Sequence, residues 1–205
     1  MNTNAKPAST LLPIHPLIRE RWSPRAFTDQ QVPSGKIRLL LEAARWAPSS
    51  SNEQPWSFLI ANRGTDPEGH ASLLSCLVPG NAVWAHRAPV LILAVARLAF
   101  ERNGRDNRHA LYDTGQSVAL LSVQATALGL AVHQMAGFDG TKAREVFAIP
   151  EGYDPVAAIA IGYPGGPELL TEPLQKRETA PRERRPVTAW AFGSHWQKPW
   201  EGGSE

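Results

Sequence analysis

The stretch EAARWAPSSSNEQPWSFLIA, residues 42–61, holds the end of a helix, a polar loop and a buried strand in immediate succession. Upstream, apolar residues recur at the i, i+3, i+4, i+7 spacing of one helix face, namely Ile37, Leu40, Leu41 and Ala44. This spacing predicts a helix over residues 36–46, which ends before Pro48. Residues 49–52 are serines and an asparagine, a composition typical of a loop. The short apolar run WSFLIA after Pro55 predicts a strand.

Outward from this stretch, the chain alternates strand and helix patterns. Further buried strands are expected at residues 88–96, 130–135 and 156–163. Residues 115–128 are small or apolar almost all round, which predicts a central helix. Asp139 is placed to cap a short helix that ends at Phe147. This order of elements predicts a mixed α/β domain.

The two ends of the chain have a different composition. Residues 1–16 contain three prolines and no apolar periodicity, so we expect an N-terminal arm. Residues 17–166 contain the predicted elements and form one domain. Residues 167–205 have too few aliphatic residues for a second core, which indicates a C-terminal arm. Residues 99–109 are expected to be a polar loop or lid.

Composition and charge exclude several classes of protein. The 205 residues carry 21 Lys and Arg against 19 Asp and Glu, and a net charge of +2 is too balanced for a nucleic-acid coat. The single cysteine, Cys76, excludes an intrachain disulfide and a cysteine metal cluster, and the histidines lack zinc-protease spacing. We expect no metal and no nucleic acid. The sequence shows no signal-peptide core and no run long enough for a membrane span, so we expect a cytoplasmic protein.

The usual catalytic signatures are missing from the sequence. It has no G-x-G-x-x-G, no phosphate-binding P-loop and no G-x-S-x-G. Arginines and amides are plentiful, which favours chemistry borrowed from a cofactor. The arginines placed to neutralise a cofactor phosphate lie near both ends of the chain and are Arg21, Arg25, Arg182 and Arg184. Asn52 and Gln54 offer donors and acceptors to the edge of a heteroaromatic ring.

Five segments match one known family in order along the chain. They are RERWSPRAF (19–27), EAARWAPSSSNEQPWSFLIA (42–61), GQSVALLSVQATALGL through HQMAGFD (115–139), IPEGYDPVAAIAIGYP (149–164) and RERRP (182–186). On these segments the chain resembles the nitroreductase family of FMN-dependent oxidoreductases. The resemblance implies an α+β sandwich, with helices on a mostly antiparallel sheet. It also implies an intertwined homodimer with two FMN sites at the interface, and it makes residues 17–166 the catalytic domain.

The resemblance also implies a set of cofactor contacts. The N-terminal contacts to FMN would be Arg21, Trp22, Ser23 and Arg25, although Trp22 is larger than is common in the family. The loop that approaches the ring from the partner subunit would comprise Pro48, Ser49, Ser50 and Asn52, with Gln54 beside it. Ala136 and Gly137 would bring a backbone amide to flavin N5, and Ala136 stands where some relatives have a glutamate. Arg182 and Arg184 of the C-terminal arm would close on the phosphate.

The implied function is hydride transfer from NAD(P)H through flavin N5 to nitro compounds, quinones or a related small acceptor, by a ping-pong mechanism. The flavin carries the chemistry, and we assign no catalytic side chain. Two alternatives remain open. One is a specialised enzyme of the same family that dehalogenates or desaturates one metabolite, because residues 62–113, which would cover the flavin, match the family poorly. The other is a non-catalytic protein that binds flavin or nucleic acid.

Overall fold

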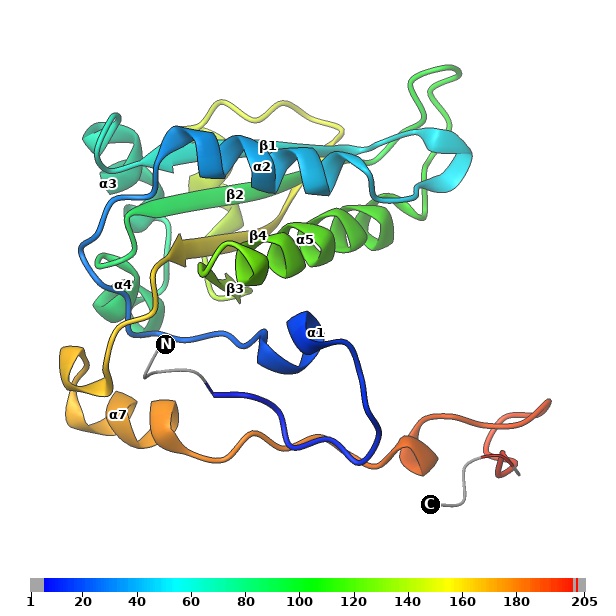
Figure 1. Cartoon of the computed structure of the whole chain (residues 1–205). Coiled ribbons are helices and arrows are strands. Elements are labelled where there is room, and N and C mark those ends of the chain that lie inside the picture. The colour runs from blue at the N-terminus through cyan, green and yellow to red at the C-terminus, as the bar shows by residue number, and fades with distance from the viewer. Residues whose placement is uncertain (1–5, 201, 203–205) are drawn as a thin grey trace.

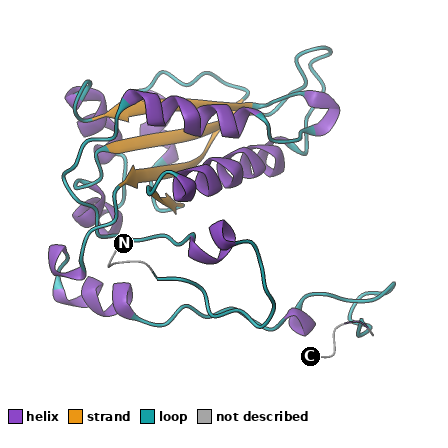
Figure 2. Cartoon of the chain, viewed as in Figure 1, coloured by secondary structure: helices purple, strands orange, loops and turns teal. Residues whose placement is uncertain are grey.

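The computed structural model describes residues 6–200 and residue 202. Within this part of the chain, four strands form one sheet between two layers of helices (Figures 1 and 2). The strands are β1 (Trp56–Asn62), β2 (Val90–Arg97), β3 (Ala131–Met135) and β4 (Tyr153–Gly162). Their order in the sheet is β1-β2-β4-β3, and each neighbouring pair is antiparallel. The expected α+β sandwich is confirmed.

One face of the sheet is covered by α2 (Ser34–Arg45) and α5 (Ala110–Ala127). Leu40 of α2 and Leu121 of α5 are fully buried there against alternate residues of β2, such as Ile92. The intervening residues of β2, such as Leu91, point to the other face of the sheet and are buried as well. A strand covered on both faces needs apolar residues at every position, which explains the unbroken apolar run at residues 88–96.

The other face is covered by α3 (Pro67–Ser75), α4 (Pro79–Ala85), α6 (Gly140–Val146) and α7 (Glu172–Thr179). Their buried residues on this face include Leu73, Trp84, Ala143 and Leu174. A short helix α1 (Pro16–Glu20) precedes the core, and single 3-10 turns lie at η1 (Ser50–Asn52), η2 (Pro167–Leu169) and η3 (Val187–Ala189). No helix among the described residues has the length and apolar character to cross a membrane.

Two element boundaries differ from the sequence expectation by three residues or more, and the others agree within two. Helix α5 begins at Ala110 rather than residue 115, so it includes the buried Asp113. Strand β4 begins at Tyr153 rather than residue 156 and includes Pro155. A proline is rare inside a strand, which is why the sequence pattern indicated a later start. The register between β2 and β4 shifts by one residue there, so Val95 pairs with Pro155 and Ala94 with Ala157. A bulge is one of the few places where a strand tolerates proline.

The segment that enters the sandwich and the segment that leaves it meet beside the core. Phe27 forms an isolated antiparallel bridge with Pro164 just after β4, and Gly165 N–H donates to the Ala26 carbonyl at 2.9 Å. From there the N-terminal and C-terminal segments run together below the sandwich in Figure 1. The division into arms at residues 16 and 167 stays a prediction.

Gly162, at the end of β4, lies where a side chain does not fit. An added Cβ would stand 2.6 Å from Pro89 Cδ and 3.0 Å from Phe27 Cδ1, and Phe27 is fully buried. We expect Gly162→Ala to lower the free energy of unfolding by about 1 to 3 kcal/mol, the usual cost of overpacking. Gly35→Ala in α2 is the matched control, since no atom lies within 4 Å of its added Cβ. Urea unfolding should show no loss for the control, and equal effects of the two changes would contradict this packing.

Candidate functional site

A depression of about 200 Å³ lies between the segment that follows α1 and the segment that follows α7. It brings the two arginine clusters together, although they lie at opposite ends of the sequence. Its lining residues are Lys6, Arg21, Trp22, Ser23, Arg25, Arg177, Glu178, Ala180, Pro181, Arg182 and Arg184. Six of the lining residues are therefore cationic and one is a carboxylate.

Arg182 joins the two segments. Its guanidinium donates to the carbonyls of Lys6 at 2.7 Å, Arg19 at 3.2 Å and Arg21 at 2.8 Å. These bonds use three of the five N–H groups of the side chain and leave two for a ligand. Arg182 thus has a structural role that the sequence did not reveal, because it closes the N-terminal segment over the C-terminal one.

The electrostatics of the depression favour an anion. Burial lowers the pKa of Arg21, and the neighbouring charge of Arg184 lowers it further. The pKa of Arg182 is also lowered, first by burial and then by Arg21 and Arg184. The lowered values mean that the positive charges cost free energy here. A bound anion would offset that cost, and guanidinium groups are well suited to bind phosphate.

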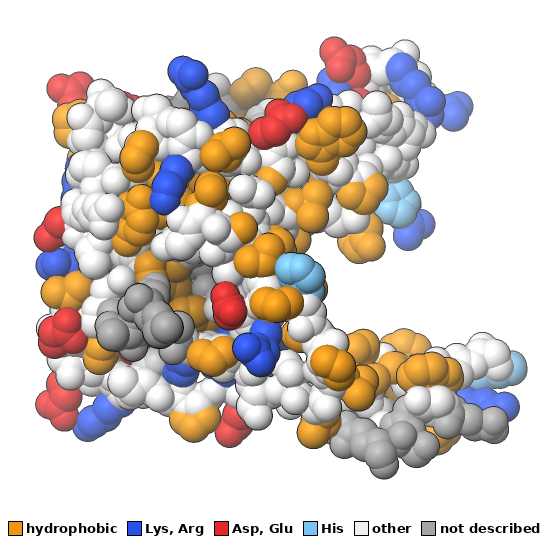
Figure 3. Space-filling view, in the orientation of Figure 1, with side chains coloured by type: hydrophobic (Ala, Val, Ile, Leu, Met, Phe, Trp, Pro, Cys, Tyr) orange, Lys and Arg blue, Asp and Glu red, His pale blue; other side chains and the backbone are white. Residues whose placement is uncertain are grey.

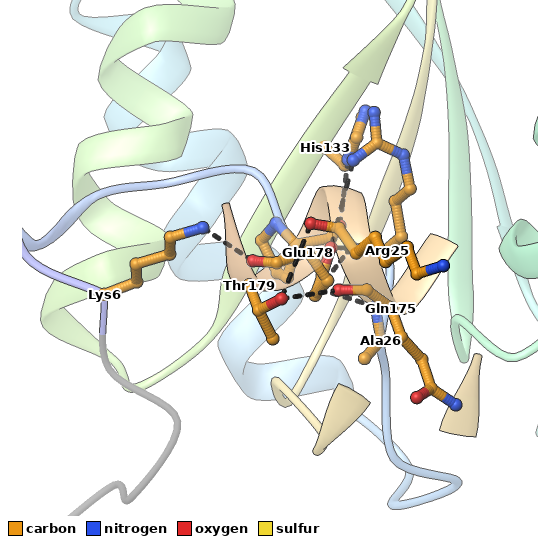
Figure 4. Close-up of polar contacts among 9 residues, drawn as sticks. Lys6, Arg25, Ala26, His133, Gln175, Glu178 and Thr179 are labelled. Carbon is orange, nitrogen blue, oxygen red and sulfur yellow. Dashed lines mark hydrogen bonds and ion pairs between the residues drawn. The ribbon is translucent and has the colours of Figure 1, made fainter. Parts of the chain in front are cut away.

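The wall formed by Ser23–Ala26 is held from both sides (Figure 4). The buried carboxylate of Glu178 accepts the backbone N–H groups of Arg25 at 2.8 Å and of Ala26 at 3.0 Å. His133 of β3 contacts the Pro24 carbonyl through Nδ1 at 2.9 Å. Because a carbonyl only accepts, this nitrogen carries the proton. His133 also packs on Trp84 of α4, with ring centroids 4.5 Å apart.

The loop that follows α2 has an unusual backbone. Ser51, Asn52 and Gln54 all have positive φ, at 55°, 55° and 49°, a conformation that costs free energy for residues other than glycine. The buried carboxylate of Asp113 holds the loop by accepting the Ser50 N–H at 2.9 Å. The Ser49 hydroxyl holds it from within by accepting the Gln54 N–H at 3.0 Å.

This loop is not brought to the depression within one chain. None of residues 48–54 lines it, and Figure 1 shows the loop, in cyan, at the top right, far from α1 and α7. Glu53 fastens the loop to the end of β2 through an ion pair with Arg97 at 2.6 Å. Its carboxylate also accepts the Glu101 N–H at 2.7 Å, which ties the 99–109 loop to the same place.

Ala136 and Gly137 follow β3 and also lie outside the lining of the depression. The Gly137 carbonyl accepts from Val78 N–H at 3.1 Å and from Asn81 Nδ2 at 3.0 Å. A Cβ at Gly137 would stand 2.6 Å from Asn81 Nδ2 and 2.9 Å from Val78 Cγ2, so a side chain here would displace both of these residues. Its N–H donates to no residue that the structure describes.

Sequence reasoning missed four ionisable residues that line or support this site, namely Lys6, His133, Arg177 and Glu178. Glu178 follows Lys176 and Arg177 in the sequence, where a lone acidic residue does not stand out. A helical signal was present, since Leu174 and Glu178 are four residues apart on one buried face of α7. His133 and Lys6 gave no such signal, because their contacts depend on segments far away in the sequence.

The comparisons with known proteins agree with this fold. A protein-family model described as "Nitroreductase family" matches residues 18–163, and this chain belongs to that family. A solved structure described as "the oxidoreductase containing FMN" superposes with a TM-score of 0.87 at 32% identity, over 93% of this chain and 96% of that one. The resemblance seen in the sequence is confirmed.

Two curated relatives cover most of the same residues. An "Uncharacterized 15.4 kDa protein in ask 5'region" of Mycolicibacterium smegmatis is 34% identical over 151 residues, which is 69% of this chain and 98% of that protein. A protein named "NADH dehydrogenase" of Thermus thermophilus is 29% identical over 177 residues, which is 71% of this chain and 83% of that protein.

His133 predicts a pH dependence of stability. Burial above all, and the charge of Arg25, lower the pKa of His133 from 6.5 to about 4. Between these values the unfolded chain binds a proton that the folded chain does not. The free energy of unfolding should therefore fall by on the order of 3 kcal/mol as the pH falls through this window.

His133→Asn tests this assignment. The asparagine amide can still donate to the Pro24 carbonyl, and the variant has no imidazole to titrate at this position. Urea unfolding between pH 7 and 4 should show a flatter pH profile for the variant. His70, whose pKa is also lowered mainly by burial, is present in both proteins and contributes equally. Parallel profiles would show that the pKa of His133 is the same in the folded and unfolded chains, which would contradict the assignment.

Proposed function

We propose that this protein is an FMN-dependent oxidoreductase that takes its reducing equivalents from NADH or NADPH. The observation that carries the proposal is the convergence of Arg21, Arg25, Arg182 and Arg184 on one depression. Membership of the nitroreductase family supports it, as does the similar structure described as containing FMN. A relative named NADH dehydrogenase supports a nicotinamide as the reductant.

The depression fits the phosphate end of FMN. A phosphate monoester carries a charge of about −2 at neutral pH, and the lining offers six cations and one carboxylate. Arg184 is exposed and uses one donor on the Glu183 carbonyl at 2.7 Å, so its other donors are available. Arg21 donates to the Ser23 hydroxyl at 3.2 Å, which points both side chains at one place. No glycine-rich loop is needed, because side chains supply the charge.

The remaining residues would orient the cofactor. FMN, when bound, supplies hydride acceptance at N5 and delivery to a second substrate such as a nitro compound or a quinone. The unbonded N–H of Gly137 is the donor we assign to the N5 side of the ring. With Ala136 in place of a glutamate, no carboxylate at this position contacts the nicotinamide or the acceptor. We assign no general acid among the side chains, so water would protonate the product.

We propose a homodimer in which the loop of residues 48–54 completes the partner's site. The strained loop lies far from the depression of its own chain (Figure 1). Large apolar side chains are exposed on the single chain, among them Leu11 at 79%, Trp46 at 71% and Trp196 at 82%. Figure 3 shows hydrophobic side chains along the protruding C-terminal segment and a hollow between this segment and the sandwich. Exposure of this extent indicates a surface covered by a partner.

A specialised reaction of the same family is the main alternative. Its pocket would be shaped by the 99–109 loop, which Glu53 ties to the 48–54 loop. Steady-state assays with NADH and NADPH against a panel of nitroaromatics and quinones separate the two. Broad tolerance of acceptors supports the proposed function, whereas turnover of one metabolite alone supports the alternative.

Arg184→Ala should weaken FMN binding about 10- to 150-fold, since a charge-assisted hydrogen bond contributes roughly 1.5 to 3 kcal/mol. Riboflavin has no phosphate, so its affinity should change much less. Arg185→Ala is the matched control, because Arg185 is exposed and does not line the depression. Fluorescence titration of the apoprotein measures both affinities. A parent protein that binds no FMN would overturn the proposed function, and an equal loss of both ligands would remove Arg184 from the phosphate site.

The dimer should bind flavin more tightly than any monomer does, because a ligand that contacts both chains stabilises their association. The dimer should not dissociate without unfolding, and sedimentation velocity in rising urea should show dissociation that added FMN shifts to higher urea concentration. A stable monomer that binds FMN tightly would contradict the shared site.

A further inference from the structure

Glu178 is the one acidic residue among those that line the depression, and it is an unexpected one. Its side chain is only 4% exposed, yet it lies beside six cationic residues. Its charge opposes the binding of a phosphate by simple repulsion. Its closest cationic atom, Arg25 Nη1, lies 3.9 Å from Oε2, which is a loose ion pair. The carboxylate therefore has to be explained by its other contacts.

Those contacts are to the backbone of the opposite segment. Oε1 accepts the N–H groups of both Arg25, at 2.8 Å, and Ala26, at 3.0 Å, and Oε2 lies 3.1 Å from the Arg25 nitrogen. Two consecutive amides thus converge on one buried carboxylate (Figure 4). They belong to the residue whose guanidinium lines the depression and to its neighbour. Hydrogen bonds to a charged, buried acceptor are strong, so they fix this backbone firmly.

Glu178 also holds the N-terminal segment at Lys6. The Glu178 backbone carbonyl accepts from Lys6 Nζ at 2.6 Å, and Lys6 in turn lines the depression. On the far side of Ser23–Ala26, His133 holds the Pro24 carbonyl. The segment that carries Ser23 and Arg25 is therefore fixed at its amides by α7 and at a carbonyl by β3.

We propose that Glu178 is a positioning residue for the FMN phosphate: through two backbone amides it sets Arg25 in its binding position before FMN arrives. This inference rests on the proposed function. Because the segment is already ordered in the folded protein, FMN binding does not pay the entropy of ordering it. The affinity for FMN is higher for that reason. The benefit outweighs the repulsion between the carboxylate and the phosphate.

Two conservative variants distinguish the length of the side chain at residue 178 from its negative charge. Glu178→Gln keeps an oxygen at the distance of Oε1 and removes the negative charge. Glu178→Asp keeps the charge and withdraws it by one methylene, out of reach of both amides. FMN and riboflavin affinities of each apoprotein are measured by fluorescence titration. Hydrogen exchange reports the protection of the Arg25 and Ala26 amides.

We expect Glu178→Asp to weaken FMN binding about tenfold, as for loss of a charge-assisted hydrogen bond, with riboflavin affinity nearly unchanged and both amides deprotected. Glu178→Gln should stay within about threefold of the parent for FMN and retain amide protection. If Glu178→Asp does not fold, a tenfold loss in Glu178→Gln with the amides still protected overturns the inference.

Three other outcomes would contradict the positioning role of Glu178. Tighter FMN binding by Glu178→Asp, or an unchanged affinity, overturns the inference and leaves the proposed function standing, because the parent still binds FMN. A larger effect of Gln than of Asp assigns the role to charge and also overturns it. A parent that binds no FMN overturns the proposed function and this inference together.

Discussion

The repulsion between like charges is the constraint around which this molecule is built. Six cationic side chains line one depression of about 200 Å³, and burial lowers the pKa of several of them, including Arg21 and Arg182. Such a group would spread apart unless the backbone that carries it were fixed. Backbone hydrogen bonds fix it here, from Arg182 to three carbonyls and from two amides to Glu178. Folding therefore holds these like charges together at a cost in free energy.

The sheet makes this arrangement possible by returning the end of β4 to the start of the core. Residues 26–28 run beside residues 163–165 through the bonds of Thr28 N–H to the Tyr163 carbonyl, at 3.0 Å, and of Gly165 N–H to the Ala26 carbonyl. The N-terminal and C-terminal segments leave the core at the same place. Two arginine clusters separated by most of the sequence then need only short segments to meet.

The sequence predicted the elements whose apolar pattern is long. It predicted the four strands, α2, α5 and α6, and it predicted that the terminal arginines would meet. It did not predict α3 and α4, which are short and begin with Pro67 and Pro79. Their patterns are too brief to show a period, and Pro at a first helical turn is also common in turns.

The supporting residues of the site escaped prediction for a different reason. The contacts of Glu178 and His133 join segments more than 100 residues apart, so no local pattern announces them. The side chains that would face a phosphate are conspicuous as arginines, whereas the groups that hold them are ordinary residues whose partners are backbone atoms. The role that we propose for the 48–54 loop depends on a second chain, which the sequence of one chain indicates only through a family resemblance.

The most direct test of this account is the phosphorus NMR spectrum of FMN bound to the protein, recorded from about pH 5 to 8. Free FMN takes up its second phosphate proton at a pH of about 6, and its resonance moves accordingly. If the depression formed by Arg21, Arg25 and Arg184 binds the phosphate, the cations hold it as a dianion, and the bound resonance should stay constant across this range. A bound resonance that titrates as free FMN does would place the phosphate in solvent and contradict the account.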